Sequence, residues 1–184
     1  MSSRHSERLF VFTGGPGSGK TTLLDALAAT GFAVMDEAGR GIIRQQQATG
    51  SDALPWADRA RFAELMLSWE LRSHALALRQ GGTVLFDRAI PDIVGYLDLS
   101  GLAVPSALTR AATDFRYNTT VFIAPHWPEI YVNDAERRQS PEEARRTHAA
   151  MTKTYLAFGY RLVELPKTGL AERVRFVVET LRAA

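Results

Sequence analysis

Cysteine is absent from the 184 residues, which excludes disulfide bonds, thiolate metal sites and a cysteine nucleophile. Long apolar runs are also missing, since none approaches the roughly 18 residues that a membrane-spanning helix requires. The first residues lack the hydrophobic segment that is typical of a secretory signal. We therefore expect no membrane association and a cytoplasmic location.

A strong charge of one sign is missing too. Lys and Arg number 22 against 20 Asp and Glu, and no basic block stands out, so no nucleic-acid partner is expected. The length fits one domain with a sizeable core. We expect residues 1–8 to form a flexible tail and residues 9–184 to form a single domain. The chain is too short for the extra helical domain of a ring-forming motor, which favours a monomer or dimer.

One stretch follows a strict pattern. Residues 14–21 fit the phosphate-binding loop G-x-x-x-x-G-K-[ST] at every fixed position. An apolar segment precedes it and a helix-like segment follows it, which is the order that the motif requires. The expected phosphate-binding residues are Gly14, Gly15, Pro16, Gly17, Ser18, Gly19, Lys20, Thr21 and Thr22.

The chemistry of this loop explains its residue types. Glycines let successive backbone N–H groups converge on an anion, and the helix N-terminus adds partial positive charge. Lys20 supplies a full charge for the outer phosphates, and the Thr21 hydroxyl is a ligand for Mg²⁺. No N/T-K-x-D run typical of guanine-specific switches is present, which favours ATP.

Five short apolar segments alternate with helix-like segments. This order predicts an α/β fold with one parallel sheet and helices on both faces. Because crossover connections are right-handed, the carboxyl ends of all strands meet at one edge. The longest expected helix runs from Pro55 to about Arg79. The five expected strands are residues 8–12, 32–35, 83–86, 119–123 and 160–165.

Charged residues follow two of these strands. Asp87 ends the third strand, where a carboxylate beside the phosphate loop can hold Mg²⁺ or accept a proton from a substrate hydroxyl. The alternative role of Asp87 is the N-cap of the following helix. Its neighbour Arg88 is expected to clamp a phosphate or to orient the carboxylates.

Asp36 and Glu37 follow the second strand, and alternation indicates that only one of them faces the active-site crevice. We favour Glu37, as a general base within reach of the substrate hydroxyl. The alternative is a capping pair for the next helix, which carries Arg40.

A charged segment follows the fourth strand and contains Arg137 and Arg138. Phosphoryl transfer requires positive charge over the transferred group, and a mobile arginine loop supplies it. The alternative is a solvated face in which these arginines pair with Asp134 and Glu136.

These motifs together resemble one family, the small AAA-type P-loop group that includes the nicotinamide riboside kinase domain of bacterial NAD regulators. More broadly they are similar to nucleoside and nucleotide kinases. The resemblance rests on the phosphate loop, the carboxylates near Arg40, Phe86-Asp87-Arg88, the run 131–137 and the segment 159–166. It implies a three-layer P-loop NTPase fold with strand order 2-3-1-4-5, a lid at about residues 126–140 that carries Arg137 and Arg138, and ATP with Mg²⁺ as cofactors.

The sequence therefore predicts a small-molecule kinase that transfers the γ-phosphoryl group of ATP to a hydroxyl of a nucleoside-like or other small metabolite. The alternative is an ATPase or a nucleotide-dependent switch without a small-molecule acceptor. The candidate catalytic residues are Lys20, Glu37, Asp87, Arg137 and Arg138, the candidate metal ligands are Thr21 and Asp87, and the candidate substrate-binding residues are Asp36, Arg40 and Arg88.

Overall fold

The computed structural model describes residues 3–127 and 140–184. Its centre is a five-stranded, all-parallel sheet in the order β2-β3-β1-β4-β5, which confirms the predicted fold class and strand order. The strands are β1 (Leu9–Gly14), β2 (Ala33–Met35), β3 (Val84–Asp87), β4 (Thr120–Ala124) and β5 (Arg161–Glu164).

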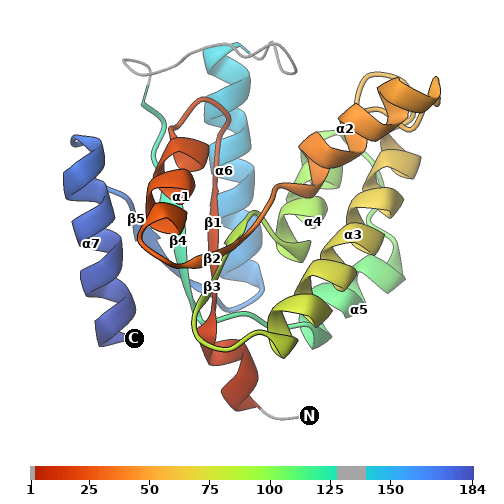
Figure 1. Cartoon of the computed structure of the whole chain (residues 1–184). Coiled ribbons are helices and arrows are strands. Elements are labelled where there is room, and N and C mark those ends of the chain that lie inside the picture. Colours follow the sequence, from red (N-terminus) through yellow and green to blue (C-terminus); the bar gives the residue numbers. More distant parts are fainter. Residues whose placement is uncertain (1–2, 128–139) are drawn as a thin grey trace.

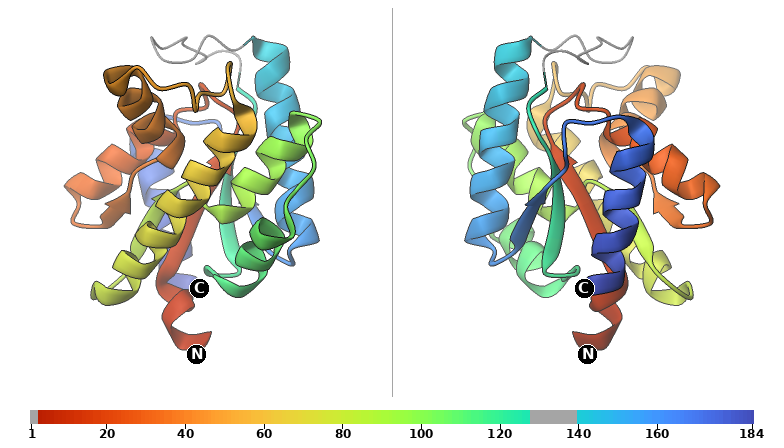
Figure 2. Two further views of the ribbon diagram at one scale, coloured as in Figure 1. Left: turned by 90° about the vertical axis from the view of Figure 1, so that its right-hand side faces the viewer. Right: turned by 90° about the vertical axis from the view of Figure 1, so that its left-hand side faces the viewer.

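Helices cover both faces of the sheet, so the molecule has three layers (Figures 1 and 2). One face carries α1 (Lys20–Ala29) and α7 (Leu170–Ala183). The other side carries α2 (Ala38–Thr49), α3 (Arg59–Arg79), α4 (Ile90–Leu99), α5 (Ser106–Asp114) and α6 (Pro141–Ala157).

The central strand β1 shows how the sequence directs these layers. All six of its residues are buried, as expected for a parallel strand covered on both sides. Leu9 and Val11 pack into a cluster with Tyr155 of α6, whereas Phe10 and Phe12 pack against α1 and α7 on the opposite face. Alternate side chains of β1 therefore point to opposite faces of the sheet and pack against both helical layers.

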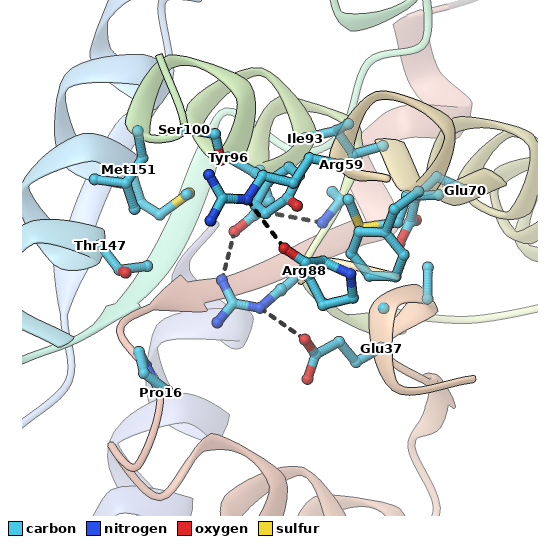
Figure 3. Close-up of a pocket in the computed structure, with 18 of the residues that line it drawn as sticks. Pro16, Glu37, Arg59, Glu70, Arg88, Ile93, Tyr96, Ser100, Thr147 and Met151 are labelled. Atoms are coloured by element: carbon cyan, nitrogen blue, oxygen red, sulfur yellow. Dashed lines mark hydrogen bonds and ion pairs between the residues drawn. The ribbon is translucent and has the colours of Figure 1, made fainter. Parts of the chain in front are cut away.

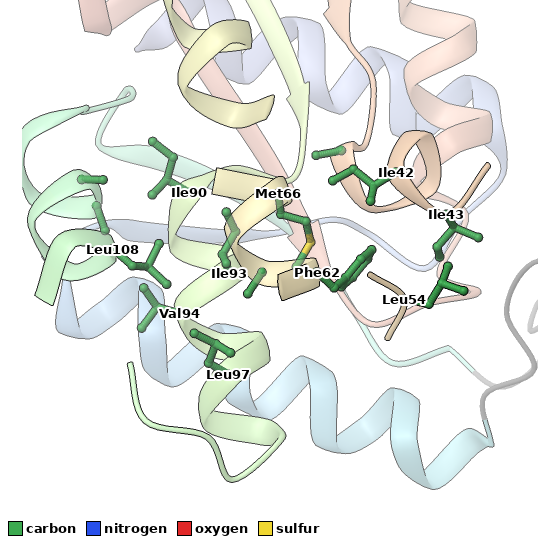
Figure 4. Packing of buried hydrophobic residues seen from close by; sticks show 14 residues of the cluster. Ile42, Ile43, Leu54, Phe62, Met66, Ile90, Ile93, Val94, Leu97 and Leu108 are labelled. Carbon is green, nitrogen blue, oxygen red and sulfur yellow. The ribbon is translucent and has the colours of Figure 1, made fainter. Parts of the chain in front are cut away.

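A separate cluster of apolar side chains holds α2, α3, α4 and α5 together beside the sheet (Figure 4). Phe62 and Met66 of α3 lie between Ile42 of α2 and Ile93 of α4. This packing fixes α2, α3 and α4 relative to one another, and their inner surfaces form most of the candidate site.

Strand register brings the expected functional segments to one edge of the sheet. Phe12 is paired with Asp87 and Gly14 with Ala124. The loop after β1 therefore begins beside the ends of β3 and β4, as the parallel arrangement predicts.

The expected start of the longest helix is wrong. The helix α3 begins at Arg59, because the Asp58 carboxylate accepts a hydrogen bond from the Arg61 backbone N–H at 3.0 Å and caps it there. Pro55 instead lies in the preceding turn. Although α3 has 21 residues, no helix in the described ranges is long and apolar enough to cross a bilayer.

Residues 3–8, expected to belong to a flexible tail, form a 3-10 helix. The Arg8 guanidinium donates hydrogen bonds to the carbonyl oxygens of Leu78 (2.8 Å) and Gly82 (3.0 Å). The Asn118 side-chain amide bonds to the carbonyl oxygen of Glu7. These bonds connect the segment to the end of α3, to the turn before β3 and to the chain before β4.

The close approach of α2 and α3 gives a test of this packing. A Cβ added at Gly41 would lie 2.6 Å from the indole edge of Trp69, whereas one at Gly95 would meet the flexible end of Met151 at 2.9 Å. Gly41→Ala is expected to lower the free energy of unfolding by about 1 kcal/mol, because overpacking outweighs the gain in helix propensity. Gly95→Ala is the matched control and is expected to be nearly neutral. Urea unfolding measures both, and a stabilised Gly41→Ala variant would contradict the described contact.

Candidate active site

The phosphate loop connects β1 to α1 in a conformation that only glycine tolerates well. Gly17 and Gly19 have φ angles of 66° and 73°, in the left-handed region that other residues avoid. At Gly14, an added Cβ would lie 2.6 Å from the carbonyl oxygen of Ala124 in β4. The loop is therefore held against the sheet, and α1 begins at Lys20 with its N-terminus toward the loop.

Lys20 is buried within this loop. Its ammonium donates hydrogen bonds to the Gly15 carbonyl oxygen (2.8 Å) and the Ser18 hydroxyl (3.3 Å). Burial, followed by the charge of Arg88, lowers the pKa of Lys20 to about 8, although the nearby carboxylates act to raise it. An anion in the loop would favour the charged form. Thr21 and Thr22 follow in the first turn of α1.

Arg173 of α7 supports the loop from a distance of 155 residues along the chain. Both terminal guanidinium nitrogens lie 3.3 Å from the Ser18 carbonyl oxygen, and the guanidinium lies over the Trp127 ring at 5.9 Å. Sequence reasoning missed this residue, because Arg173 stands in an ordinary amphipathic helix pattern without any motif around it.

Asp87 lies at the carboxyl end of β3 beside the loop. Its Oδ2 accepts a hydrogen bond from the Thr21 hydroxyl at 3.5 Å, while its buried Oδ1 has no hydrogen-bond partner in the described part of the chain. Burial, followed by the charge of Glu37, raises the pKa of Asp87 to about 6. The N-cap of α4 is Ala89, so the alternative capping role of Asp87 is wrong.

This arrangement fits the Mg²⁺ ion that the family resemblance implies. Mg²⁺ prefers oxygen ligands and keeps several waters, so one hydroxyl, one carboxylate and substrate phosphates suffice. The unsatisfied Asp87 oxygen next to Thr21 meets that requirement. Within residues 3–127 and 140–184, no group of three or more His, Cys, Asp or Glu side chains forms a metal site built from protein alone.

Glu37 and Asp36 have different environments. Glu37 is 7% exposed and points into the cavity described below, whereas Asp36 is exposed and does not line it. Glu37 stands at the N-cap position of α2 but makes no side-chain capping bond. Its two oxygens instead pair with Arg40 (3.1 Å) and Arg88 (3.2 Å).

Arg88 links the carboxylates of the site. Its φ of 71° is the one positive value at a non-glycine residue in the described ranges, and such strain occurs most often at functional sites. The guanidinium donates from Nε to Glu37 and from Nη1 to Asp92, at 3.2 and 3.0 Å. Burial acts to lower the pKa of Arg88, but the charges of Glu37, Asp92 and Asp87 outweigh it and raise the pKa.

Asp92 is a residue of the site that sequence reasoning missed. It accepts hydrogen bonds from four donors: the Thr13 hydroxyl, the Arg88 guanidinium, the Ala89 backbone N–H and the Tyr155 hydroxyl. In the sequence it is only the third residue of a helix, where an acidic side chain is ordinary. The structure makes it the point that joins β1, α4 and α6.

Asp92→Asn is expected to lower the free energy of unfolding by about 3 kcal/mol, because it removes one partner of a buried ion pair. The new amide nitrogen cannot accept the hydrogen bonds that the carboxylate accepts. Urea denaturation measures the loss. Asp98→Asn, the same change at an exposed position of α4, is the control. Equal stability of the two variants would contradict the role of Asp92.

A cavity of about 540 Å³ opens between the phosphate loop and helices α2, α3, α4 and α6 (Figure 3). Pro16 of the loop and Thr147 of α6 lie on one side, and Glu37 and Glu70 on the other, with Arg88 between them. Apolar and aromatic side chains form the remaining wall, among them Trp56, Phe62, Met66, Ile93, Tyr96 and Met151.

The AAA domain family matches residues 9–173 of the sequence. The chain belongs to this family. Among curated proteins no relative matches this AAA domain. Its fold is that of several P-loop kinases.

Many solved structures share this fold, and three of them illustrate the similarity. Deoxyadenosine kinase from M. mycoides, solved with dCMP and a flexible dCDP, has a TM-score of 0.65 at 12% identity. The match covers 96% of this chain and 100% of the kinase chain. Thymidylate kinase from Ehrlichia chaffeensis has a TM-score of 0.62 at 18% identity, with 96% and 99% covered. NadR in complex with NR has a TM-score of 0.70 at 18% identity, and the match covers 98% of this chain but only 52% of NadR.

The expected lid is mostly outside the described residues, and so are Arg137 and Arg138. Of the other predicted site residues, Lys20, Glu37, Asp87 and Arg88 gather at the edge of the sheet. Arg40 is half-buried beside Glu37 and does not line the cavity.

Proposed function

We propose that this AAA domain is a phosphotransferase that moves the γ-phosphoryl group of ATP to a hydroxyl of a small metabolite. The observation that carries the proposal is the cavity of about 540 Å³ beside the phosphate loop, with the Glu37–Arg88 ion pair in its wall. Pockets for small molecules commonly enclose about 300–1,000 Å³. A protein that only hydrolyses ATP requires no additional cavity of that size beside its phosphate loop.

The buried groups suit an in-line transfer. The acceptor hydroxyl lies in the cavity, and Glu37 takes its proton. The oxygen of the acceptor then forms a bond to the γ-phosphorus, as the bond between the γ-phosphorus and the bridging oxygen of ADP breaks. Arg88 orients the Glu37 carboxylate through their 3.2 Å contact. Lys20 and the loop N–H groups bind the phosphates and stabilise the charge on the departing ADP.

Thr21 and Asp87 are the residues that would hold Mg²⁺. Bound there, the ion would neutralise phosphate charge and help to orient the transferred group. Asp87 borders the loop and does not line the cavity, whereas Glu37 does. This difference favours Glu37 as the base and Asp87 as the metal ligand. Arg137 and Arg138 remain the candidates for positive charge over the transferred group.

A nucleoside-like acceptor is the most suitable class. Its ring would lie against the apolar and aromatic wall, and its sugar hydroxyl would face Glu37. Two proteins of the same fold are named for, or solved with, nucleoside-type compounds. At 12% and 18% identity these likenesses support the class of acceptor but not its identity.

ADP release in the presence of Mg²⁺ and ATP tests the proposal. A library of nucleosides, vitamins and sugars is added one compound at a time, and at least one hydroxyl-bearing compound is expected to accelerate ADP release at least tenfold. ATP turnover that no compound changes would contradict the proposal and favour an ATPase or a nucleotide-dependent switch.

A further inference from the structure

Glu70 of α3 is a buried carboxyl group in the wall of the cavity. It is 3% exposed, and it makes no hydrogen bond or ion pair within the described residues. It reaches the cavity from the same helix as Phe62 and Met66 (Figure 3). A carboxyl group in such surroundings costs folding free energy unless a partner satisfies it.

The other charged groups that line the cavity are already paired or lie at its mouth. Glu37 and Asp92 both bind Arg88. Arg59 and Arg146 are exposed, so they are not buried partners for Glu70.

The charges that act on Glu70 are themselves negative. Burial raises its pKa well above the ordinary value, and Asp92, Asp87 and Glu37 raise it further. These effects favour the neutral carboxyl group, and a bound group with N–H donors or positive charge would favour the carboxylate.

We propose that Glu70 is the specificity-determining residue for the acceptor, and that it binds a hydrogen-bond-donating nitrogen group on the acceptor ring. This inference rests on the proposed function. Pro16 and Glu37 mark the part of the cavity where the reacting hydroxyl would lie, and Phe62, Met66 and Glu70 mark the part that receives the ring. The acceptor class is an alcohol whose ring carries an amino, amidine or cationic nitrogen.

Two matched pairs of probes test the inference without ATP. Cytidine is compared with uridine, and benzamidine with benzamide, because each pair differs in the nitrogen group and keeps a similar ring. Binding is measured by ligand-observed NMR titration to wild type, Glu70→Gln and Glu70→Leu. Glu64→Gln, an exposed position of the same helix, is the control.

Wild type and the Glu64→Gln control are expected to bind cytidine and benzamidine at least tenfold more tightly than their partners. A hydrogen bond to a charged group has about that effect on affinity. Glu70→Leu is expected to remove the preference in both pairs. Glu70→Gln distinguishes the two sources of recognition, because it keeps hydrogen bonding and loses charge. A retained cytidine preference indicates neutral N–H recognition, and loss of both preferences indicates that recognition requires the carboxylate charge.

Ligand-free stability gives a second readout. Glu70→Gln and Glu70→Leu are expected to raise the melting temperature at pH 8, because they remove a buried carboxyl group whose ionisation burial disfavours. Wild type that binds neither probe pair selectively, or a Glu70→Leu variant that keeps both preferences, would overturn the inference. Selective binding without any phosphoryl transfer would instead contradict the proposed function and leave the role of Glu70 standing.

Discussion

Lys20→Met is expected to slow ATP-dependent phosphoryl transfer by about a hundredfold to a thousandfold, the usual effect of removing one group that stabilises transition-state charge. The methionine keeps the length of the side chain and removes the ammonium that the loop holds beside Gly15 and Ser18. Initial rates of ADP release and the affinity for ATP measure the change.

The fold is expected to survive this substitution. Burial already disfavours the charge of Lys20, which is the main reason that its pKa is lowered to about 8. The Gly15 carbonyl oxygen also keeps the hydrogen bond from the Ser18 hydroxyl, at 2.7 Å. Lys153→Met, the same change at an exposed position of α6, is the control. A folded Lys20→Met protein with wild-type rates would contradict the role assigned to the loop.

Glu37→Gln is expected to lower kcat by about a hundredfold to ten-thousandfold, the range that general-base catalysis contributes. Glutamine has nearly the same shape but cannot take a proton from the acceptor hydroxyl. Steady-state kinetics with the acceptor found by ADP release, at saturating ATP, measures kcat and KM separately. The affinity for ATP is expected to change little, because Glu37 lies in the wall of the cavity rather than in the phosphate loop.

Two further variants make this result decisive. Glu179→Gln, at an exposed position of α7, controls for the loss of a carboxylate. Asp87→Asn tests the other candidate base and is expected to raise the Mg²⁺ concentration needed for the half-maximal rate, because it removes a charged metal ligand. Unchanged kcat in Glu37→Gln, together with a large loss of kcat in Asp87→Asn, would show that the two roles are reversed.

The fold was predictable because its signals are local and strict. The phosphate loop has fixed residues at fixed spacing, and buried strands such as Val84–Phe86 are continuous apolar runs. Once the strands are parallel and their connections right-handed, Asp87 and Glu37 must meet the loop at one edge. The start of α3 was less predictable, because a first-turn proline at Pro55 and an N-cap at Asp58 are both acceptable start signals, and it is the Asp58 cap that forms.

Asp92, Glu70 and Arg173 were not predictable in the same way. Each stands in a helix whose local pattern gives an acidic or basic residue no special meaning. Asp92 receives its donors from β1, from the connection between β3 and α4, and from α6, and Arg173 meets the loop across 155 residues of chain. Their roles come from tertiary packing that no local spacing encodes.

The most direct test of the central claim is ³¹P NMR of Mg²⁺ and ATP with the protein and a pooled library of nucleosides, vitamins and sugars. The chemical shift separates a phosphomonoester from inorganic phosphate, and Lys20→Ala is measured beside the wild type. We expect a new phosphomonoester signal, formed together with ADP, that is absent from the Lys20→Ala sample. Inorganic phosphate as the sole new product would contradict phosphoryl transfer to an acceptor in the cavity.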